Sequence, residues 1–518
     1  MSADSRRDYL VLALLSAAVS AAALVFCFRQ NAILLYGDAV AHINIARRVF
    51  DSRTPGVLQL GTVWLPLPHL LDIPFVMNDW LWRSGVGAAI PSMLAYIAGI
   101  LGIFRLVRGR ASRTSALIAA LMYALNPNLI YLQATAMTEP LYLALFVWTA
   151  VYFSEFVQQT DDPARAGRAL ERCSIVLSAA MLVRYDAWFL AGFVFAGVFL
   201  VVWRAGFFRG ARRQLLNFAL LPVLTICLWL AYNHAAYGNA LEFANGPYSA
   251  RAIQQRSRTA TMPTYPGENS PRDAALYFLK LVRLNAAEGR AEYLVFTVAF
   301  VTLLAMIYFS RDYWPWVLLW VPVPFYVISI AWGSVPIYFP EWYPHSFYNV
   351  RYGLQMLPAL AVFFALGCEF LINFFTWSRV AGAAAVVIFL SYLSVWQRAP
   401  ICLREAQVNG GARMAFEQQL GAQLKKLPAS ATLMMDCSAH AGAVQRAGIH
   451  FRHILRESNP PYWEEALAQP AQSADYVVAI TGDEVWLAVR RSARGLAPIA
   501  TVSTPGQPGV VIYRSTPR

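Results

Sequence analysis

The chain has 518 residues, of which 58% are hydrophobic and 14% are charged, and its mean hydropathy is +0.45. A soluble globular chain carries about 25% charged residues, so this composition excludes a soluble single domain as well as disordered, collagen-like and coiled-coil proteins. Lipid is the alternative solvent, and 16 Trp and 25 Tyr fit it because amphipathic rings settle at membrane–water boundaries. We attribute the net charge of +13 to cytoplasmic loops and lipid phosphates rather than to nucleic acid.

Apolar segments predict an α-helical polytopic membrane protein with about eleven spans. The first segment, residues 10–28, follows Arg6 and Arg7 and exceeds the apolar core of a signal peptide. The other ten segments are residues 84–104, 115–131, 140–156, 174–183, 187–203, 215–232, 293–310, 313–332, 352–375 and 380–396.

One of these segments, residues 174–183, is only about half as long as a bilayer requires. Either its helix begins earlier, with Arg168 and Arg172 reaching the membrane surface, or residues 174–203 form one interrupted span. Basic clusters flank residues 174–203 on both sides and belong on the same side of the membrane, so we predict two crossings. Whether residues 174–183 span fully is left open.

Short basic loops predict the orientation of the chain. Three clusters of arginine lie in short loops. The first follows the second span and consists of Arg105, Arg108, Arg110 and Arg113. The second precedes residues 174–183 and consists of Arg165, Arg168 and Arg172, and the third follows residue 203. The positive-inside rule places these loops and the N-terminus in the cytoplasm. The longer segments 29–83, 233–292 and 333–351, and the tail, then lie outside.

The tail differs in character from the apolar part, so we divide the chain into residues 1–396 and residues 397–518. Residues 411–425 have an amphipathic helical pattern, and residues 431–436, 475–480 and 509–514 are typical of short strands. They predict a small α/β domain outside the membrane. Its run from Asp436 to His440 is better explained structurally than as a catalytic triad, and a disulfide between Cys402 and Cys437 is left open.

The first outer loop offers a carboxylate and an imidazole one helical turn apart. Apolar spacing predicts a helix over residues 40–50, with Asp38 at its start and His42 on the same face. Asp38 is then either a helix cap or a general base, because a helix N-terminus favours an anionic carboxylate in both cases. We interpret His42 as an orienting partner.

Other charged residues stand at the outer ends of spans. Glu139 begins the span over residues 140–156, and Arg184 and Asp186 flank the junction before residues 187–203. Because charge within a membrane costs about 2.5–3.5 kcal/mol on insertion scales, these groups are expected to face a polar cavity, where Arg184 and Asp186 pair for either a structural or a functional reason. Arg351 and Tyr352 open a further span, where a guanidinium is suited to a phosphate.

The long outer loop, residues 233–292, is rich in cations and contains Tyr237 and Gly238 near its start. Long loops escape the positive-inside rule, so cations such as Arg251 and Lys280 suggest an anionic partner. Lipid headgroups in general, or one bound lipid phosphate, both fit this pattern.

Together these motifs resemble the GT-C superfamily of integral-membrane glycosyltransferases. The likeness is to polyprenyl-phosphate-sugar-dependent enzymes related to protein mannosyltransferases, aminoarabinose transferases and mycobacterial arabinosyltransferases. The matching elements are Gly37-Asp38 with His42, Thr138-Glu139-Pro140-Leu141, Arg184-Tyr185-Asp186, Tyr237-Gly238-Asn239, Arg351-Tyr352 and the α/β tail. Many relatives have two adjacent acids where this chain has Gly37-Asp38, and an Arg-Pro-Glu-Gly motif where it has Arg184 to Ala187, which obscures the subfamily.

The resemblance implies an inverting transfer of a sugar from a polyprenyl-phosphate donor to a hydroxyl on a glycan, lipid or protein acceptor at the periplasmic face of the inner membrane. Asp38 is then the general base, and Arg351 with cations of residues 233–292 stabilises the leaving phosphate. Arg184 and Asp186 shape the pocket or bind the sugar, and Glu139 binds the sugar or helps to hold a metal. No cofactor is certain; some members of the superfamily hold a divalent metal, and the sequence leaves this open.

A polyprenyl-lipid flippase or transporter is the competing interpretation. Transporters usually place ionisable residues near the bilayer midplane within discontinuous spans. Here Asp38, Glu139 and Arg351 all fall at predicted outer ends, which favours an enzyme. Only the short segment 174–183 favours transport.

Overall fold

The computed structural model describes residues 3–204, 208–309, 311–375 and 378–516. The chain forms two compact units. The helical unit comprises residues 1–26, 62–68 and 91–405, and the mixed unit comprises residues 27–61, 69–90 and 406–518. The mixed unit thus combines the tail with most of the first outer loop, and the predicted boundary at residue 396 stays a prediction.

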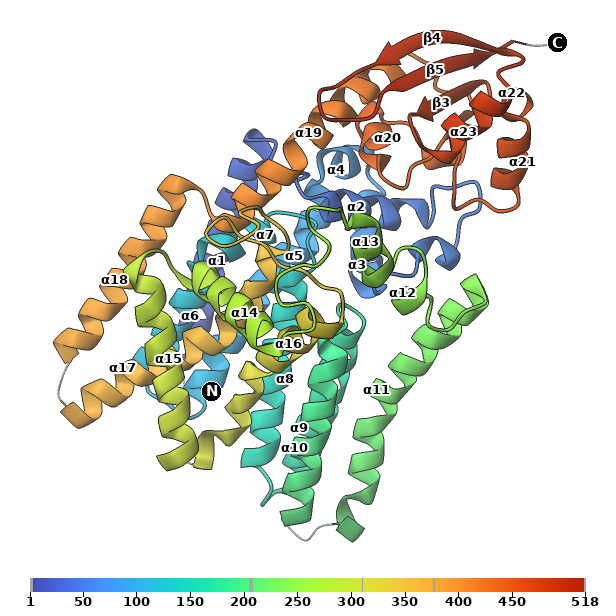
Figure 1. Ribbon diagram of the computed structural model, residues 1–518. Helices are drawn as coiled ribbons and strands as arrows, with labels where there is room; N and C mark the ends of the chain where they lie inside the picture. Colours follow the sequence, from blue (N-terminus) through green and yellow to red (C-terminus); the bar gives the residue numbers. More distant parts are fainter. Residues whose placement is uncertain (1–2, 205–207, 310, 376–377, 517–518) are drawn as a thin grey trace. The chain divides into compact units, whose positions relative to one another are not determined.

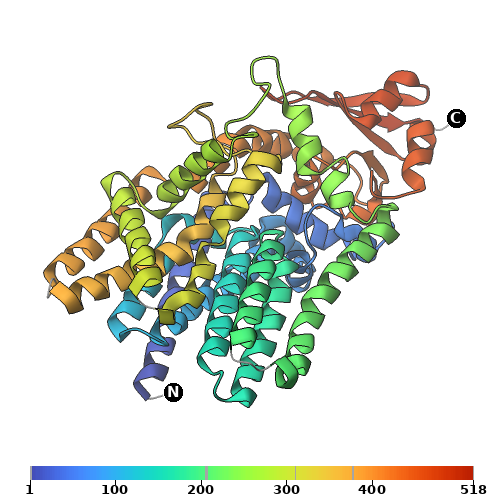
Figure 2. The ribbon, with the colours of Figure 1, turned by 60° about the horizontal axis from the view of Figure 1, so that its bottom comes forward.

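Long helices make up most of the helical unit (Figures 1 and 2). Its elements, some of which continue into the mixed unit, are α1 (Ala3–Arg29), α5 (Val86–Arg108), α6 (Arg113–Ala124), α7 (Pro127–Gln133), α8 (Glu139–Gln158), α9 (Pro163–Met181), α10 (Asp186–Arg204), α11 (Phe208–Tyr237), α12 (Glu242–Asn245), α13 (Ala250–Ser257), α14 (Pro271–Ala286), α15 (Arg290–Phe309), η2 (Arg311–Trp320), α16 (Pro322–Trp332), η3 (Val350–Met356), α17 (Leu357–Phe375), α18 (Ser378–Arg398) and α19 (Ile401–Leu424).

The described residues contain nine helices that are long and apolar enough to cross a membrane, or ten when the bent pair α6 and α7 counts as one span. Together with α9, these helices correspond to the predicted segments. A multi-pass membrane protein is therefore confirmed. Residue 310, the predicted end of one span, lies outside the described residues.

Helix α9 resolves the short segment at residues 174–183. The helix begins at Pro163, where the side chain of Asp162 accepts hydrogen bonds from the backbone N–H groups of Ala164 and Arg165. A proline in the first turn is already set to the helical φ and loses no backbone bond there. Residues 174–181 are therefore the second half of a longer helix, as the first of the two interpretations expected.

Helices α8, α9 and α10 pack against one another, and both ribbon views show them side by side (Figures 1 and 2). Small residues permit this close packing. A Cβ on Gly197 in α10 would lie 2.6 Å from the ring of Phe153 in α8, so the two helices approach more closely here than an alanine would allow. A second group of packed helices contains α14, which packs against η3 and α16.

The mixed unit contains a five-stranded sheet with the strand order β2-β1-β3-β5-β4. Its strands are β1 (Leu433–Met435), β2 (Ile454–Leu455), β3 (Tyr476–Ile480), β4 (Leu496–Val502) and β5 (Val510–Ser515), and its helices include α2 (Gly37–Arg48), η1 (Val57–Leu60), α3 (Leu67–Val76), α4 (Asp79–Ser84), α20 (Ala441–Ala447), η4 (Phe451–His453), α21 (Tyr462–Ala468), α22 (Pro470–Ser473) and α23 (Glu484–Arg491). Strand β1 is parallel to β2 and β3, whereas β5 is antiparallel to β3 and β4.

The three strands predicted in the tail correspond to β1, β3 and β5, and the predicted amphipathic helix is part of α19. Strand β2 was not expected because it is only two residues long, and β4 was not expected because it contains Pro498 next to an irregularity in register. Cys402 and Cys437 are both free and buried, so the disulfide left open above is not formed.

Hydrogen bonds tie the first outer loop to the tail within the mixed unit. Asn44 in α2 donates to Oε1 of Gln445 in α20 over 2.9 Å. Arg47 donates from Nε to Asp51 over 2.8 Å and from Nη2 to Asp79 over 2.7 Å. Because Asn44, Arg47 and Gln445 are buried, α2 is held in one orientation by its polar face as well as by apolar packing.

Candidate functional site

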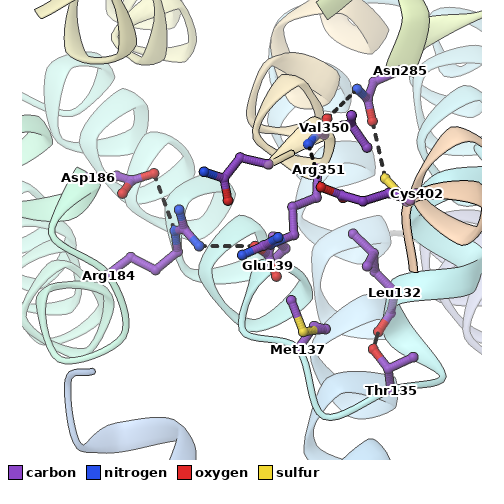
Figure 3. Close-up of polar contacts among 12 residues, drawn as sticks. Leu132, Thr135, Met137, Glu139, Arg184, Asp186, Asn285, Val350, Arg351 and Cys402 are labelled. Carbon is purple, nitrogen blue, oxygen red and sulfur yellow. Dashed lines mark hydrogen bonds and ion pairs between the residues drawn. The ribbon is translucent and has the colours of Figure 1, made fainter. Parts of the chain in front are cut away.

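Glu139 lies at the centre of the buried charge cluster in the helical unit. It is the first residue of α8 and its side chain is 1% exposed. Its Oε1 accepts hydrogen bonds from Nη1 of Arg184 over 3.1 Å and from Nε of Arg351 over 3.0 Å. Figure 3 shows the carboxylate between the two guanidinium groups. A buried carboxylate needs such partners, since an unpaired charge would cost several kcal/mol.

Arg184 connects Glu139 to a second carboxylate. Its Nε donates to Oδ2 of Asp186 over 3.3 Å, and its Nη2 donates to the hydroxyl of Tyr326 over 3.1 Å. The same Tyr326 hydroxyl donates to Oδ2 of Asp186 over 2.7 Å. Burial opposes the charged form of Arg184, but the nearby acidic groups, Asp186 foremost, outweigh it and raise the pKa of Arg184 above its ordinary value.

Arg351 comes from η3, whose position is fixed by α14 and the start of α19. Asn285 in α14 donates to the carbonyl oxygen of Val350 over 2.8 Å, and Glu405 accepts from the Val350 backbone N–H over 3.2 Å. Figure 3 shows Asn285 beside Val350 and Cys402. A Cβ on Gly353 would lie 2.6 Å from the carbonyl oxygen of Leu281. Glycine at this position therefore lets η3 pack directly on the backbone of α14.

Aromatic rings cover the guanidinium groups of the cluster. The Cζ atoms of Arg184 and Arg351 each lie 5.2 Å from the centroid of the Tyr352 ring, and Arg184 is 5.9 Å from that of Tyr142. Such contacts favour a cation over a ring face. The two guanidinium groups and the two carboxylates pair with one another, so their charges balance within the cluster.

Three buried polar atoms on α8 and η3, the elements that supply Glu139 and Arg351, have no hydrogen-bond partner among the described residues. They are Oε2 of Glu139 and both amide atoms of Gln355, a residue of η3. Buried polar groups are nearly always paired. These atoms are therefore available to a polar ligand, which would donate to Glu139 and both donate to and accept from Gln355.

The structure thus brings together Glu139, Arg184, Asp186, Arg351 and Tyr352 of the sequence-predicted site. Tyr326, Tyr142 and Gln355 were not predicted. The signal for Tyr326 was a hydroxyl in the middle of an apolar span, where it must find a polar partner.

The cations predicted in residues 233–292 have different surroundings. Lys280 is buried in α14 and pairs with Glu292 over 3.0 Å and with Glu341 over 2.6 Å. Burial alone would lower the pKa of Lys280, but its hydrogen bonds to the two carboxylates raise it. Tyr237 ends α11 and is 41% exposed, and Arg251 lies on the exposed side of α13. Among the described residues, neither Lys280 nor Arg251 forms an ion pair with the carboxylates of the Glu139 cluster.

The first-loop candidates belong to the mixed unit. Asp38 lies in the first turn of α2 and is half-buried, as its predicted position near a helix start requires. His42 is buried one turn later, and its Nδ1 lies 2.8 Å from Nε2 of His69. His69 was not predicted as a partner. This bond fixes the ring of His42 on the face of α2 that also carries Asp38.

A metal site was left open by the sequence. Within the described parts of the chain, no three His, Cys, Asp or Glu side chains are grouped so as to hold a metal ion. The two carboxylates of the cluster are instead joined through Arg184, and we derive no step through a metal.

The fold is similar to that of solved structures with the GT-C fold, which confirms the predicted fold class. Residues 82–236, which contain Glu139, Arg184 and Asp186, match the family model for dolichyl-phosphate-mannose-protein mannosyltransferase. None of the curated proteins matches the sequence.

The solved structures that this chain resembles include ArnT from Cupriavidus metallidurans. The apo form aligns with a TM-score of 0.58 and 13% identity over 95% of this chain and 98% of ArnT. The form bound to undecaprenyl phosphate aligns with a TM-score of 0.59 and 13% identity over 100% of both chains. An oligosaccharyltransferase from Archaeoglobus fulgidus, crystallised with Zn and sulfate, aligns with a TM-score of 0.50 and 12% identity over 98% of this chain and 73% of its own.

Proposed function

We propose that this protein is a membrane glycosyltransferase that moves a sugar from a polyprenyl-phosphate donor to a hydroxyl acceptor, with inversion at the anomeric carbon. The observation that carries the proposal is the pair of buried arginines on Glu139, in a chain with the fold of an enzyme solved with undecaprenyl phosphate. Guanidinium groups recognise phosphate through several parallel hydrogen bonds. A cluster that already holds two of them needs little reorganisation to bind one.

The leaving phosphate gains negative charge as its bond to the sugar breaks, and we propose that Arg351 and Arg184 stabilise that charge. Both side chains are largely buried, at 10% and 14% exposure, so their interaction with an anion is screened less than it would be in water. Glu139 and Asp186 keep the arginines in place when no donor is bound. A donor phosphate would then share the arginines with these carboxylates.

We propose that the unpaired polar atoms of Glu139 and Gln355 bind hydroxyl groups of the sugar. Oε2 of Glu139 can accept a hydrogen bond from a sugar hydroxyl, and the amide of Gln355 offers both a donor and an acceptor. A sugar presents several hydroxyls of either character, whereas an apolar ligand would leave these buried atoms unsatisfied. This assignment retains the role expected for Glu139 in sugar binding.

Asp38 is proposed as the general base. Its carboxylate takes the proton of the acceptor hydroxyl while the hydroxyl oxygen forms a bond to the anomeric carbon. The bond between that carbon and the donor phosphate oxygen breaks in the same step, and its electron pair leaves with polyprenyl phosphate. Asp38 lies in the first turn of α2, and the His42–His69 bond supports a positioning role for His42.

The remaining expected residues are proposed for supporting roles. Lys280 is neutralised by two carboxylates, so we assign it to holding α14 and thereby η3, rather than to direct phosphate binding. Tyr237 and Arg251 are exposed and are suited to the approach of an anionic lipid headgroup or of the acceptor. Whether the acceptor is a glycan, a lipid or a protein is left to experiment.

We place the reaction on the periplasmic side of the inner membrane, with the N-terminus in the cytoplasm and residues 397–518 outside. The support is the distribution of basic residues. Arg105, Arg108, Arg165 and Arg172 lie where α5 ends and α9 begins, whereas Glu139 lies at the opposite end of α8. By the positive-inside rule the arginine-rich ends face the cytoplasm, which puts Glu139 on the other side.

The test is a donor–acceptor assay with the purified full chain in liposomes. Polyprenyl-phosphate sugars serve as donors, and release of polyprenyl phosphate is measured with and without a hydroxyl acceptor. Acceptor-dependent release supports the transferase. Movement of donor lipid between leaflets without any release would replace this proposal with a flippase.

A further inference from the structure

A pocket of about 490 Å³ lies at the end of α8 remote from Glu139. It is lined by residues of α1, α5, α8 and α9, among them Tyr9, Arg105, Glu155 and Arg168. Glu155 and Glu139 are both on α8, and a helical rise of about 1.5 Å per residue separates them by roughly 24 Å. The pocket is therefore distinct from the proposed transferase site.

Five arginines line this pocket against one carboxylate. The arginines are Arg105, Arg108, Arg165, Arg168 and Arg172, and the carboxylate is Glu155. Arg105 pairs with Glu155 over 2.7 Å, and Arg165 pairs with Asp162 over 3.2 Å. The described part of the chain gives Arg108 and Arg168 no carboxylate partner. Asp8, the ion-pair partner of Arg113, lies near enough to Arg108 to offset part of its charge, and Arg108 and Arg168 both line the same pocket.

Two features organise these charges. Cζ of Arg105 lies 5.4 Å from the ring centroid of Trp148 and 5.7 Å from that of Tyr152, so its guanidinium is held by aromatic rings as well as by Glu155. Arg165 is in the first turn of α9, where the helix dipole adds positive potential, and Arg168 and Arg172 follow it along the same helix. Arginines that served only to set the membrane orientation would not need to line a single pocket.

The position of the pocket indicates the source of its ligand. Arg105 and Arg108 form the last turn of α5, a candidate membrane span, and α8 is a second span that ends beside them. Groups at the ends of spans lie at the level of phospholipid headgroups. We infer that this pocket binds a phosphate-bearing anion and that a phospholipid headgroup supplies the phosphate.

The experiment uses the purified full chain in detergent, titrated with phosphatidylglycerol, with phosphatidylcholine as the neutral-headgroup comparison, and bound lipid is counted by native mass spectrometry. The double variant Arg108→Gln/Arg168→Gln should bind phosphatidylglycerol about tenfold more weakly, since each basic residue near an anionic headgroup contributes on the order of a few-fold. Glu155→Gln should bind it several-fold more tightly, because it removes the carboxylate that competes with the ligand for Arg105.

The matched control is Arg6→Gln/Arg379→Gln, which removes the same charge from exposed positions outside the pocket lining. Unchanged lipid binding by this control supports a built site. Equal losses in both double variants, or no gain in Glu155→Gln, would overturn the proposal. Inorganic phosphate forms the second arm: binding of phosphate alone, without preference for phosphatidylglycerol over phosphatidylcholine, would overturn the lipid assignment.

Discussion

Glu139 and Arg351 are 212 positions apart in the sequence, yet Nε of Arg351 donates to Oε1 of Glu139 over 3.0 Å. The carboxylate begins α8 and the guanidinium comes from the short helix η3, so this contact joins two separate parts of the helical unit. Arg184 donates to the same oxygen. One carboxylate oxygen therefore sets the spacing of two cations, which is the arrangement that a phosphate would meet.

Replacing Glu139 with Gln should reduce both stability and turnover. The substitution preserves shape but leaves two buried guanidinium groups with only Asp186 to balance them. Breaking a buried pair costs about 3 kcal/mol in the free energy of unfolding, and we expect turnover to fall by about a hundredfold as the arginines lose their spacing. Thermal unfolding in detergent and the donor-release assay measure the two effects. Glu464→Gln, on the exposed side of α21, is the control; similar losses in both variants would remove the special role of Glu139.

Tyr326→Phe should weaken the Arg184–Asp186 pair without removing either charge. The variant loses the hydrogen bond to Asp186 and the acceptor for Arg184. We expect a loss of about 1–2 kcal/mol in the free energy of unfolding together with reduced donor release. Tyr308→Phe, at a position that is 82% exposed, should behave as the wild type. Full activity of Tyr326→Phe would show that the hydroxyl does not support the cluster.

Gly353→Ala tests whether the contact between η3 and α14 positions Arg351. The added Cβ would meet the carbonyl oxygen of Leu281 at 2.6 Å and Nδ2 of Asn285 at 2.7 Å, so η3 must move. A loss of about 1–3 kcal/mol is typical of such overpacking, and turnover should fall with it. Gly382→Ala is the control because nothing lies within 4 Å of its Cβ. Equal behaviour of the two variants would contradict the positioning role of η3.

The buried His69 should make the mixed unit less stable in mild acid. Burial lowers the pKa of His69 well below its ordinary value of 6.5, and repulsion from positive charge at His42 and Arg48 acts in the same direction. Below about pH 6.5 the unfolded chain binds a proton that the folded chain does not, so stability is lost as the pH falls towards the lowered pKa. The limiting slope is about 1.4 kcal/mol per pH unit. Thermal unfolding between pH 7.5 and about 5.5 measures how stability depends on pH, and this dependence should be smaller in His69→Gln than in the wild type. An unchanged dependence would contradict the role of His69.

Hydropathy and charge were enough to predict the spans and the residues at their ends. Apolar length locates each span because a bilayer imposes it, and Glu139, Arg184 and Arg351 stood out because charge is scarce in this chain. The start of α9 was uncertain from apolar length alone, since its first turns are arginine-rich and only the Asp162 cap marks the beginning.

Pairings between distant residues could not be predicted from the sequence. Lys280 was expected to meet an anionic partner, but Glu292 and Glu341 supply that partner from within the chain. The contacts of Tyr326 and the bond between His42 and His69 likewise depend on how helices pack. Local patterns determine which elements form, whereas these contacts depend on packing between elements far apart in sequence.

Asp38→Asn tests the central claim most directly. Acceptor-dependent release of polyprenyl phosphate is measured for the wild type, for Asp38→Asn and for Asp161→Asn, an exposed control position. Binding of the donor lipid is measured in parallel to show that each variant inserts and folds. The account predicts that Asp38→Asn binds donor but releases no polyprenyl phosphate above background, while the control is fully active. Full turnover by Asp38→Asn would contradict it.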